Sequence, residues 1–121
     1  MEIGFFTMPI HPINKDYKKT LSEDREAFLL ADKIGFSEAY CGEHVTDAAE
    51  NITSSALFIA SLAAETKKIR LGTGTVNMPN SHPAAIAGQI AMLDHMLDGR
   101  FNFGISPGGL ASDAEAFGNL D

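Results

Sequence analysis

Residues 69–77 of this 121-residue chain read IRLGTGTVN, a short apolar run that passes into glycine and small polar residues. A run of this length and composition is typical of a β-strand that is buried on both faces. Similar short apolar runs occupy residues 3–6, 37–41 and 101–106. Because longer segments with helical periodicity separate the four runs, we predict a single α/β domain built on a parallel sheet.

Three of these longer segments are expected to be complete helices. The first should cover residues 21–34, with Thr20 and Glu23 at the spacing of a capping box. The second should cover residues 54–67, where alanines and isoleucine recur on one face. The third should cover residues 83–97, since it opens with a proline in the first turn and ends before a glycine.

Polar and glycine-rich residues are concentrated directly after the predicted strands. They form the segments 7–9, 42–44, 73–77 and 106–109, whereas the turns from helix back to strand are short and plain. The loops over residues 7–20 and 42–53 are also longer than most strand-to-helix loops. In a parallel α/β fold this asymmetry predicts a functional site at the carboxyl ends of the strands.

The motifs of several other kinds of site are incomplete. Gly72-Thr73-Gly74 begins like a dinucleotide fingerprint, but Asn77 stands at the third glycine position and Pro79 follows in place of a helix. Residues 104–109 have the glycine spacing of a P-loop without its lysine. The histidines lack the helical spacing of a metal site, and there is no serine-hydrolase elbow. We therefore expect no metal site.

Composition restricts the partners. The net charge of −7 argues against nucleic acid, because phosphate binding needs a basic surface. No apolar stretch reaches the roughly 18 residues that a membrane span needs, so no membrane association is expected. Cys41 is the only cysteine and cannot form an internal disulfide, which suits a reducing cytoplasm.

Several segments, taken in order, resemble the luciferase-like flavin monooxygenases. They are FTMPIHP at residues 6–12, ADKIGF at 31–36, GEH at 42–44, IRLGTG at 69–74, and LDHMLDGRF at 93–101 followed by FGI at 103–105. Each segment alone is weak, but the ordered set is specific and is most similar to the alkanal and limonene monooxygenase-like branch. The resemblance implies a TIM (β/α)8 barrel, of which this chain would form about the first four βα units, a half barrel with parallel strands.

The resemblance also implies a reaction. Such enzymes use reduced FMN and O2 to oxygenate a small apolar substrate, and a separate flavin reductase supplies the reduced FMN. Two alternatives stay open: an F420- or FMN-dependent oxidoreductase of the same fold without O2 activation, and a non-catalytic half barrel that only binds flavin or assembles. Members of the family are often dimers, so a homodimer or other self-association is expected.

Roles for individual residues follow from the same resemblance. His44 is the predicted catalytic residue, since an imidazole can give or take a proton near neutral pH; a structural pairing with a carboxylate such as Glu43 is the alternative. The predicted cofactor-binding residues are Thr73, Gly74 and Thr75 at a strained, often cis, peptide under the flavin ring, Asn77 at its edge, and Ser106 at the end of the fourth strand. The predicted substrate pocket contains Phe6, Met8 and Glu43, for which core packing or loop closure is the alternative.

The length of the chain carries an expectation of its own. A complete barrel needs about 250 residues, and its phosphate site usually lies near the last two strands. We therefore expect residues 1–121 to be the N-terminal half of a truncated barrel domain, without the FMN phosphate site and inactive by itself. A fourth helix should begin at Ser112, with Glu115 as its capping-box partner.

Overall fold

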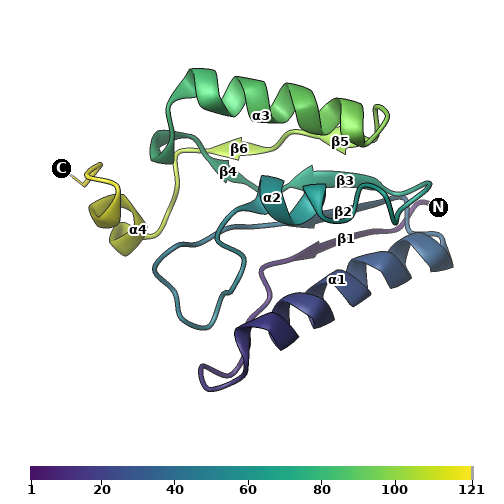
Figure 1. Cartoon of the computed structure of the whole chain (residues 1–121), viewed down its shortest axis with the longest axis horizontal. Helices are drawn as coiled ribbons and strands as arrows, with labels where there is room; N and C mark the ends of the chain where they lie inside the picture. The colour runs from purple at the N-terminus through teal and green to yellow at the C-terminus, as the bar shows by residue number, and fades with distance from the viewer. Residues whose placement is uncertain (121) are drawn as a thin grey trace.

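Four short strands form one parallel sheet whose neighbours follow chain order. In the computed structural model, which describes residues 1–120, they are β1 (Gly4–Thr7), β2 (Glu38–Cys41), β3 (Arg70–Thr73) and β5 (Phe101–Asn102). Figure 1 shows the strands side by side with the helices between them in the chain. The prediction of a parallel α/β domain is confirmed.

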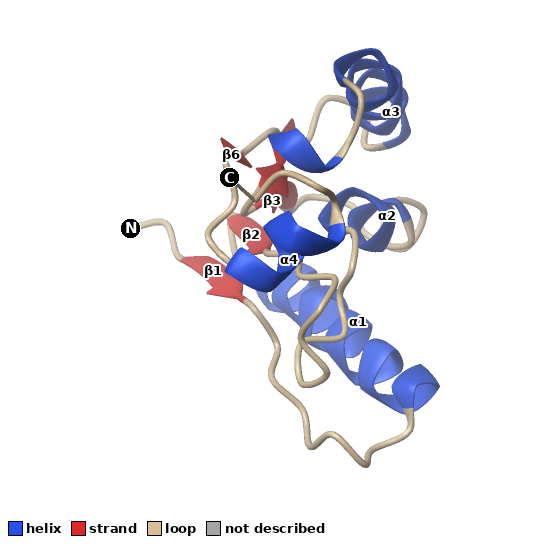
Figure 2. Cartoon of the chain, turned by 90° about the vertical axis from the view of Figure 1, so that its left-hand side faces the viewer, coloured by secondary structure: helices blue, strands red, loops and turns tan. Residues whose placement is uncertain are grey.

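The three longer connections place their helices on one face of this sheet. The helices are α1 (Tyr17–Ile34), α2 (Ser55–Ala60) and α3 (Pro83–Met96), and in Figure 2 all three lie on the same side of the strands. A doubly wound sheet would have helices on both faces. Right-handed crossovers that all return to one face produce the wall of a barrel instead.

The hydrophobic core fills the space between the sheet and these helices. Ala39, Cys41 and Leu71 point from the strands into it and are fully buried. Phe28 of α1 is also fully buried, with its ring centroid 5.0 Å from that of Phe5. Alternate strand residues point to the other face of the sheet, because successive side chains of a strand point in opposite directions.

The third and fourth strands are both interrupted at the same level of the sheet. After β3 the peptide between Gly74 and Thr75 is cis, and the chain continues as β4 (Val76–Asn77). The fourth strand is likewise divided into β5 and β6 (Ile105–Ser106), and β6 pairs in parallel with β4. The prediction of one continuous strand over residues 101–106 is therefore wrong at Phe103 and Gly104.

A side chain explains this break. The Thr73 hydroxyl accepts a hydrogen bond from the Gly104 N–H at 2.9 Å and donates one to the Gly104 carbonyl at 2.8 Å. The Gly104 N–H is therefore bound to the threonine side chain, while the Gly104 carbonyl accepts both the Thr73 hydroxyl and the Val76 N–H at 2.9 Å. A Cβ on Gly104 would lie 2.1 Å from the Thr73 carbonyl oxygen, so the close approach requires glycine.

The first helix begins earlier than the sequence predicts. Asp16 is its N-cap, and its side chain accepts the Lys19 N–H at 2.9 Å. Thr20 lies fully buried inside the helix and donates its hydroxyl to the Tyr17 carbonyl. The predicted capping box of Thr20 and Glu23 is therefore wrong, because an aspartate four residues upstream caps the helix instead.

The second helix is shorter than predicted. It ends at Ala60, and turns follow to residue 65 in place of the expected continuation to residue 67. The Arg25 guanidinium donates to both the carbonyl and the hydroxyl of Ser61, and the Glu65 N–H bonds to the Leu62 carbonyl. The helical pattern stops before that carbonyl: the Ser61 hydroxyl donates to the Phe58 carbonyl at 2.6 Å, and the Leu62 N–H bonds to the Ile59 carbonyl instead. The contact with Arg25 then holds the turn that follows α2.

The third helix agrees with its prediction to within one residue. His82 precedes Pro83, and its Nδ1 accepts the Ala84 N–H at 3.1 Å. A 3-10 turn, η1 (Met78–Asn80), and a short terminal helix, α4 (Ala111–Ala116), complete the described chain. Helix α4 has no side-chain cap, so the predicted capping box of Ser112 and Glu115 is wrong. Within residues 1–120, no helix is both long and apolar enough to span a membrane.

Candidate functional site

A cavity of about 340 Å³ lies at the carboxyl ends of the parallel strands. This volume is within the range of small-molecule pockets, about 300–1,000 Å³. Its lining comes from the last residues of β4 and β6 and from the loops that follow β1, β2, β3 and β6: Met8, Glu43, His44, Gly74, Thr75, Asn77, Ser106, Gly109 and Leu110. The structure thus brings together every predicted site residue except Phe6 and Thr73.

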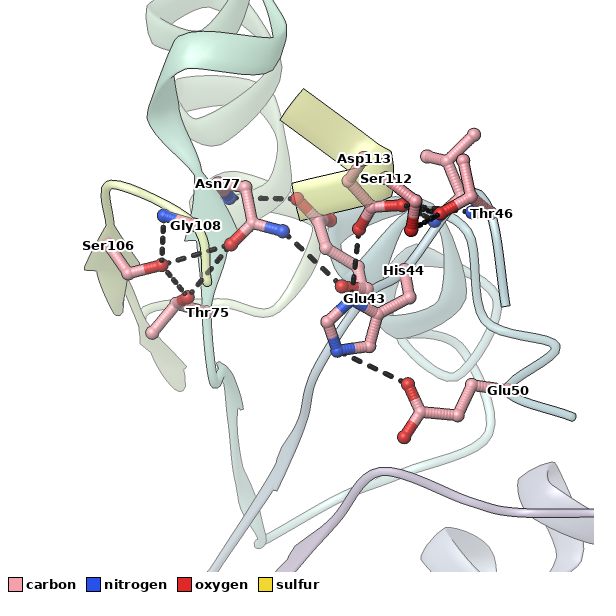
Figure 3. A network of polar contacts seen from close by, with 11 residues as sticks. Glu43, His44, Thr46, Glu50, Thr75, Asn77, Ser106, Gly108, Ser112 and Asp113 are labelled. Carbon is pink, nitrogen blue, oxygen red and sulfur yellow. Dashed lines mark hydrogen bonds and ion pairs between the residues drawn. The ribbon is translucent and has the colours of Figure 1, made fainter. Parts of the chain in front are cut away.

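Three polar side chains form a hydrogen-bonded relay along one wall of the cavity (Figure 3). Asn77 Nδ2 donates to the Glu43 carbonyl at 3.3 Å, which turns Asn77 Oδ1 toward Ser106. Ser106 Oγ donates to Asn77 Oδ1 at 2.9 Å and receives the Gly108 N–H at 3.2 Å. Thr75 Oγ1 lies 2.6 Å from Ser106 Oγ, a contact in which either hydroxyl can donate, and 3.5 Å from Asn77 Oδ1. The three side chains thus form one connected polar network on the surface of the cavity.

The Glu43 carboxylate holds two walls of the cavity together. Its Oε1 accepts the Asn77 N–H at 2.9 Å, and its Oε2 accepts the Ser55 N–H at 2.8 Å and the Ser55 hydroxyl at 3.0 Å. Ser55 begins α2, and Asn77 ends β4. The side chain of Glu43 therefore ties the loop after β2 to its neighbours, while still contributing to the cavity surface.

The imidazole of His44 lies between two carboxylates. Its Nδ1 is 2.9 Å from Asp113 Oδ2, and its Nε2 is 3.2 Å from Glu50 Oε2. Both contacts are drawn in Figure 3. The pairing of His44 with a carboxylate is therefore present, but the partners are Asp113 and Glu50, because the Glu43 carboxylate is bound to Ser55 and Asn77.

Asp113 comes from α4, which the chain brings back over the loop after β2. Its Oδ1 accepts the N–H groups of Val45 and Thr46 at 3.1 and 2.9 Å and the Thr46 hydroxyl at 2.7 Å. Burial by itself raises the pKa of Asp113, but the hydrogen bonds from His44 and Thr46 outweigh it and hold the pKa below its ordinary value. Asp113 is therefore an ionised, acceptor-only carboxylate at neutral pH.

Phe6 and Thr73 lie next to the cavity without lining it. Phe6 is on the open face of the sheet and 59% exposed, and a Cβ on Gly74 would lie 2.9 Å from its ring. Thr73 is buried, and its hydroxyl is occupied by Gly104. Phe6 thus packs beside the Gly74 backbone, and Thr73 shapes the break that opens the cavity.

Sequence reasoning missed three residues of this site. Asp113 and Glu50 flank His44, and Ser55 donates hydrogen bonds to the Glu43 carboxylate. Asp113 is 69 residues from His44 in the chain, so no local spacing connects them. Glu50 lies in the long loop after the second strand, and the length of that loop is the one signal in the sequence that pointed to it.

Parallel strands with helices on one face and a polar cavity at their carboxyl ends define an α/β-barrel type of site. The chain matches the luciferase-like monooxygenase family over residues 1–121, and it belongs to that family. This confirms the resemblance found in the sequence.

Characterised relatives agree with this assignment. The chain is 38% identical over 118 residues to 4-hydroxyprotoasukamycin monooxygenase of Streptomyces nodosus subsp. asukaensis, which covers 98% of this chain and 32% of that protein. It is 36% identical over 118 residues to limonene 1,2-monooxygenase of Rhodococcus erythropolis, covering 98% of this chain and 30% of that protein. The chain therefore spans about a third of the length of these relatives.

A solved structure confirms the fold. The oxygenating constituent of 3,6-diketocamphane monooxygenase from Pseudomonas putida, a type II Baeyer-Villiger monooxygenase in complex with FMN, superposes with a TM-score of 0.93 at 29% identity. The match covers 98% of this chain and 32% of that chain. The described residues thus have the fold of part of a luciferase-like barrel, as the sequence predicted.

Proposed function

We propose that this chain carries part of the active site of an FMN-dependent monooxygenase that oxygenates a small apolar substrate with O2. One observation supports this most directly. The cavity at the strand ends combines the Thr75–Ser106–Asn77 relay with His44, a residue that can move protons. Family membership and the FMN-bound 3,6-diketocamphane monooxygenase supply the cofactor and the reaction class.

The lining of the cavity fits the ring system of a flavin. The hydrogen-bond acceptors and donors of the flavin ring would meet the hydroxyls of Thr75 and Ser106 and the amide of Asn77. Met8 would offer the ring an apolar contact. Gly74 and Gly109 bring bare backbone to the cavity, and a Cβ on Gly109 would meet no atom within 4 Å. Bound reduced FMN would supply the electrons for O2 activation.

The FMN phosphate has no counterpart in this cavity. Among the described residues that line it, none is a lysine or an arginine. Glu43 and Asp113 add negative charge to its surroundings, which disfavours a phosphate there. We therefore propose that residues 1–120 hold the flavin ring alone and that the phosphate binds outside them.

His44 is proposed to move a proton between the substrate and Glu50. The ring lines the cavity, and Asp113 binds its Nδ1 on the side of α4. Nε2 remains for proton exchange and faces Glu50 at 3.2 Å. Thr73, Phe6 and Met8 are proposed to shape the cofactor and substrate walls around it.

The partners are proposed from the family. A separate flavin reductase would supply reduced FMN, and a homodimer is the proposed assembly. Leu57 of α2 and Met92 and Met96 of α3 are exposed side by side, which supports self-association. Sedimentation of the protein tests this, and a concentration-independent monomer would contradict it. The buried Cys41 supports a cytoplasmic location.

An oxygen-labelling experiment tests the activity. The protein is mixed with reduced FMN, isotopically labelled O2 and small apolar ketones or terpenes, and label in the product is measured. Incorporation that is lost in His44→Gln supports the proposal. Turnover of reduced F420 without label would favour the non-oxygenating alternative, and flavin binding without any turnover would favour the non-catalytic one.

Flavin titration tests the division of the cofactor site. Flavin fluorescence is followed while this 121-residue chain is added to FMN or to riboflavin, which lacks the phosphate. Because no lysine or arginine of the cavity lining would bind the phosphate, the two flavins should have similar dissociation constants. A preference for FMN of tenfold or more would contradict the proposal that only the ring is held here.

A further inference from the structure

We propose that Asp113 is a positioning residue that fixes the proton of His44 on Nδ1 and leaves Nε2, which faces Glu50, for proton exchange. The importance of this role for catalysis rests on the proposed function, but the position of the proton does not. It follows from the hydrogen bonds around the two oxygens of Asp113.

These two oxygens have different partners. Oδ1 is occupied by three donors, the N–H groups of Val45 and Thr46 and the Thr46 hydroxyl. Oδ2 faces His44 Nδ1 at 2.9 Å. Asp113 is only 4% exposed, and its pKa is held below the ordinary value. An ionised carboxylate can only accept, so His44 Nδ1 must carry a proton and donate it.

The other ring nitrogen has a different environment. Nε2 faces one oxygen of Glu50 at 3.2 Å, and the ring itself lines the cavity. A proton on Nε2 can pass to Glu50 while Nδ1 keeps its own proton on Asp113. The pair Asp113 and Glu50 thus separates the two nitrogens into a fixed one and an exchanging one.

Replacing Asp113 by asparagine tests the proposed proton position, because the surrounding donors allow only one orientation of the amide. The amide oxygen has to stay where Oδ1 is, since three donors converge there. The amide NH2 then points at His44 Nδ1, which must give up its proton and accept. The proton of His44 is therefore expected on Nε2, on the side of Glu50.

The chain contains a matched control, its second histidine–aspartate pair. His11 Nε2 lies 2.7 Å from Asp24 Oδ1, and Asp24 is 7% exposed. Among residues 1–120, no group forms a hydrogen bond with the buried Asp24 Oδ2. In Asp24→Asn no set of donors fixes the amide, so its oxygen can remain on His11 and no change in the proton position of His11 is forced.

The experiment is NMR of the protein labelled with 15N in its histidine rings, with signals assigned from His44→Gln and His11→Gln. We expect a protonated Nδ1 at His44 in the wild type, an unprotonated Nδ1 in Asp113→Asn, and no change at His11 in Asp24→Asn. A wild-type His44 whose Nδ1 lacks a proton would overturn the proposal, even if the variant failed to fold. So would a folded Asp113→Asn that keeps the proton on Nδ1.

A kinetic measurement separates this proposal from the proposed function. If His44 exchanges protons through Nε2 during turnover, Asp113→Asn should lower kcat by about a hundredfold or more with little change in KM. Asp113→Glu, which keeps an acceptor for Nδ1, should recover part of that loss. A switched proton with unchanged kcat would overturn the catalytic role of His44 and leave the role of Asp113 in placing the proton intact.

Discussion

The Glu43 carboxylate is the side chain whose removal should most disturb the framework of the cavity. It accepts the N–H groups of both Ser55 and Asn77, at 2.8 and 2.9 Å. Truncation in Glu43→Ala would leave both donors without an acceptor. Ser55 is completely buried and Asn77 is 8% exposed, so neither donor has free access to bulk water in the folded chain.

The expected loss follows from these two donors. A buried group left without its partner costs about 1–3 kcal/mol, which gives roughly 2–6 kcal/mol for the pair. Glu43 also lines the cavity, and water there can replace part of the lost bonding. We therefore expect the free energy of unfolding to fall by about 2–4 kcal/mol, a large part of the roughly 5–15 kcal/mol of a typical domain.

Urea unfolding followed by circular dichroism measures this loss. With a slope of about 1–2 kcal/mol per molar, a loss of 3 kcal/mol lowers the midpoint by roughly 2 M. Glu26→Ala is the matched control, because Glu26 is an exposed glutamate of α1 and should change stability by no more than about 0.5 kcal/mol. Midpoints for the two variants within 0.5 M or so of each other would refute the reasoning.

Three further predictions concern the scaffold. Gly72→Ala should destabilise the protein by about 1–3 kcal/mol in urea unfolding, because the new Cβ would lie 2.3 Å from the Tyr40 ring. The control Gly88→Ala, in open space on α3, should stabilise it by up to about 1 kcal/mol. Equal effects of the two substitutions on stability would contradict this. The Asp32 carboxylate, despite the opposing effect of burial, has its pKa lowered from 3.8 by three backbone N–H groups. The Asp32 carboxyl therefore binds its proton more tightly in the unfolded chain, so its contribution to the free energy of unfolding is present above pH 3.8 and is lost as the pH falls below it. Asp32→Asn should flatten the acid limb of a curve of stability against pH. Burial raises the pKa of the Cys41 thiol, so alkylation should require unfolding, and rapid modification of the native protein would count against it.

Local patterns in the sequence were sufficient where neighbours in the chain control the structure. The third helix has a proline, a capping histidine and a terminal glycine within its own segment, and it was predicted to within one residue. The start of the first helix was missed although a local signal existed, since Asp16 three residues before Lys19 is a good N-cap. The end of the second helix was missed, because it depends on the Ser61 hydroxyl binding the Phe58 carbonyl and on Arg25 of another helix binding the Ser61 carbonyl.

The features of the site also fall into those that local sequence predicted and those that it did not. The gathering of His44, Thr75, Asn77 and Ser106 at strand ends was readable from the chain, because parallel strands bring their carboxyl ends to one edge, although Asn77 and Ser106 are themselves the last residues of β4 and β6. The sequence did not predict the hydrogen bonds among these side chains or the identity of the carboxylates around His44. Asp113 reaches His44 across 69 residues, and Glu43 binds Ser55 and Asn77 rather than the histidine beside it.

The sequence by itself determined the alternation of strands and helices, the family, and the edge of the sheet where the cavity lies, because periodicity and strand direction are local properties. Only the tertiary structure decided where the fourth strand breaks, which oxygen meets which donor, and which nitrogen of His44 is held. Those outcomes depend on hydrogen bonds between groups far apart in the chain, such as Thr73 with Gly104 and Asp113 with His44. No spacing in the sequence encodes such bonds, since they form only after the core has set the distances between the loops.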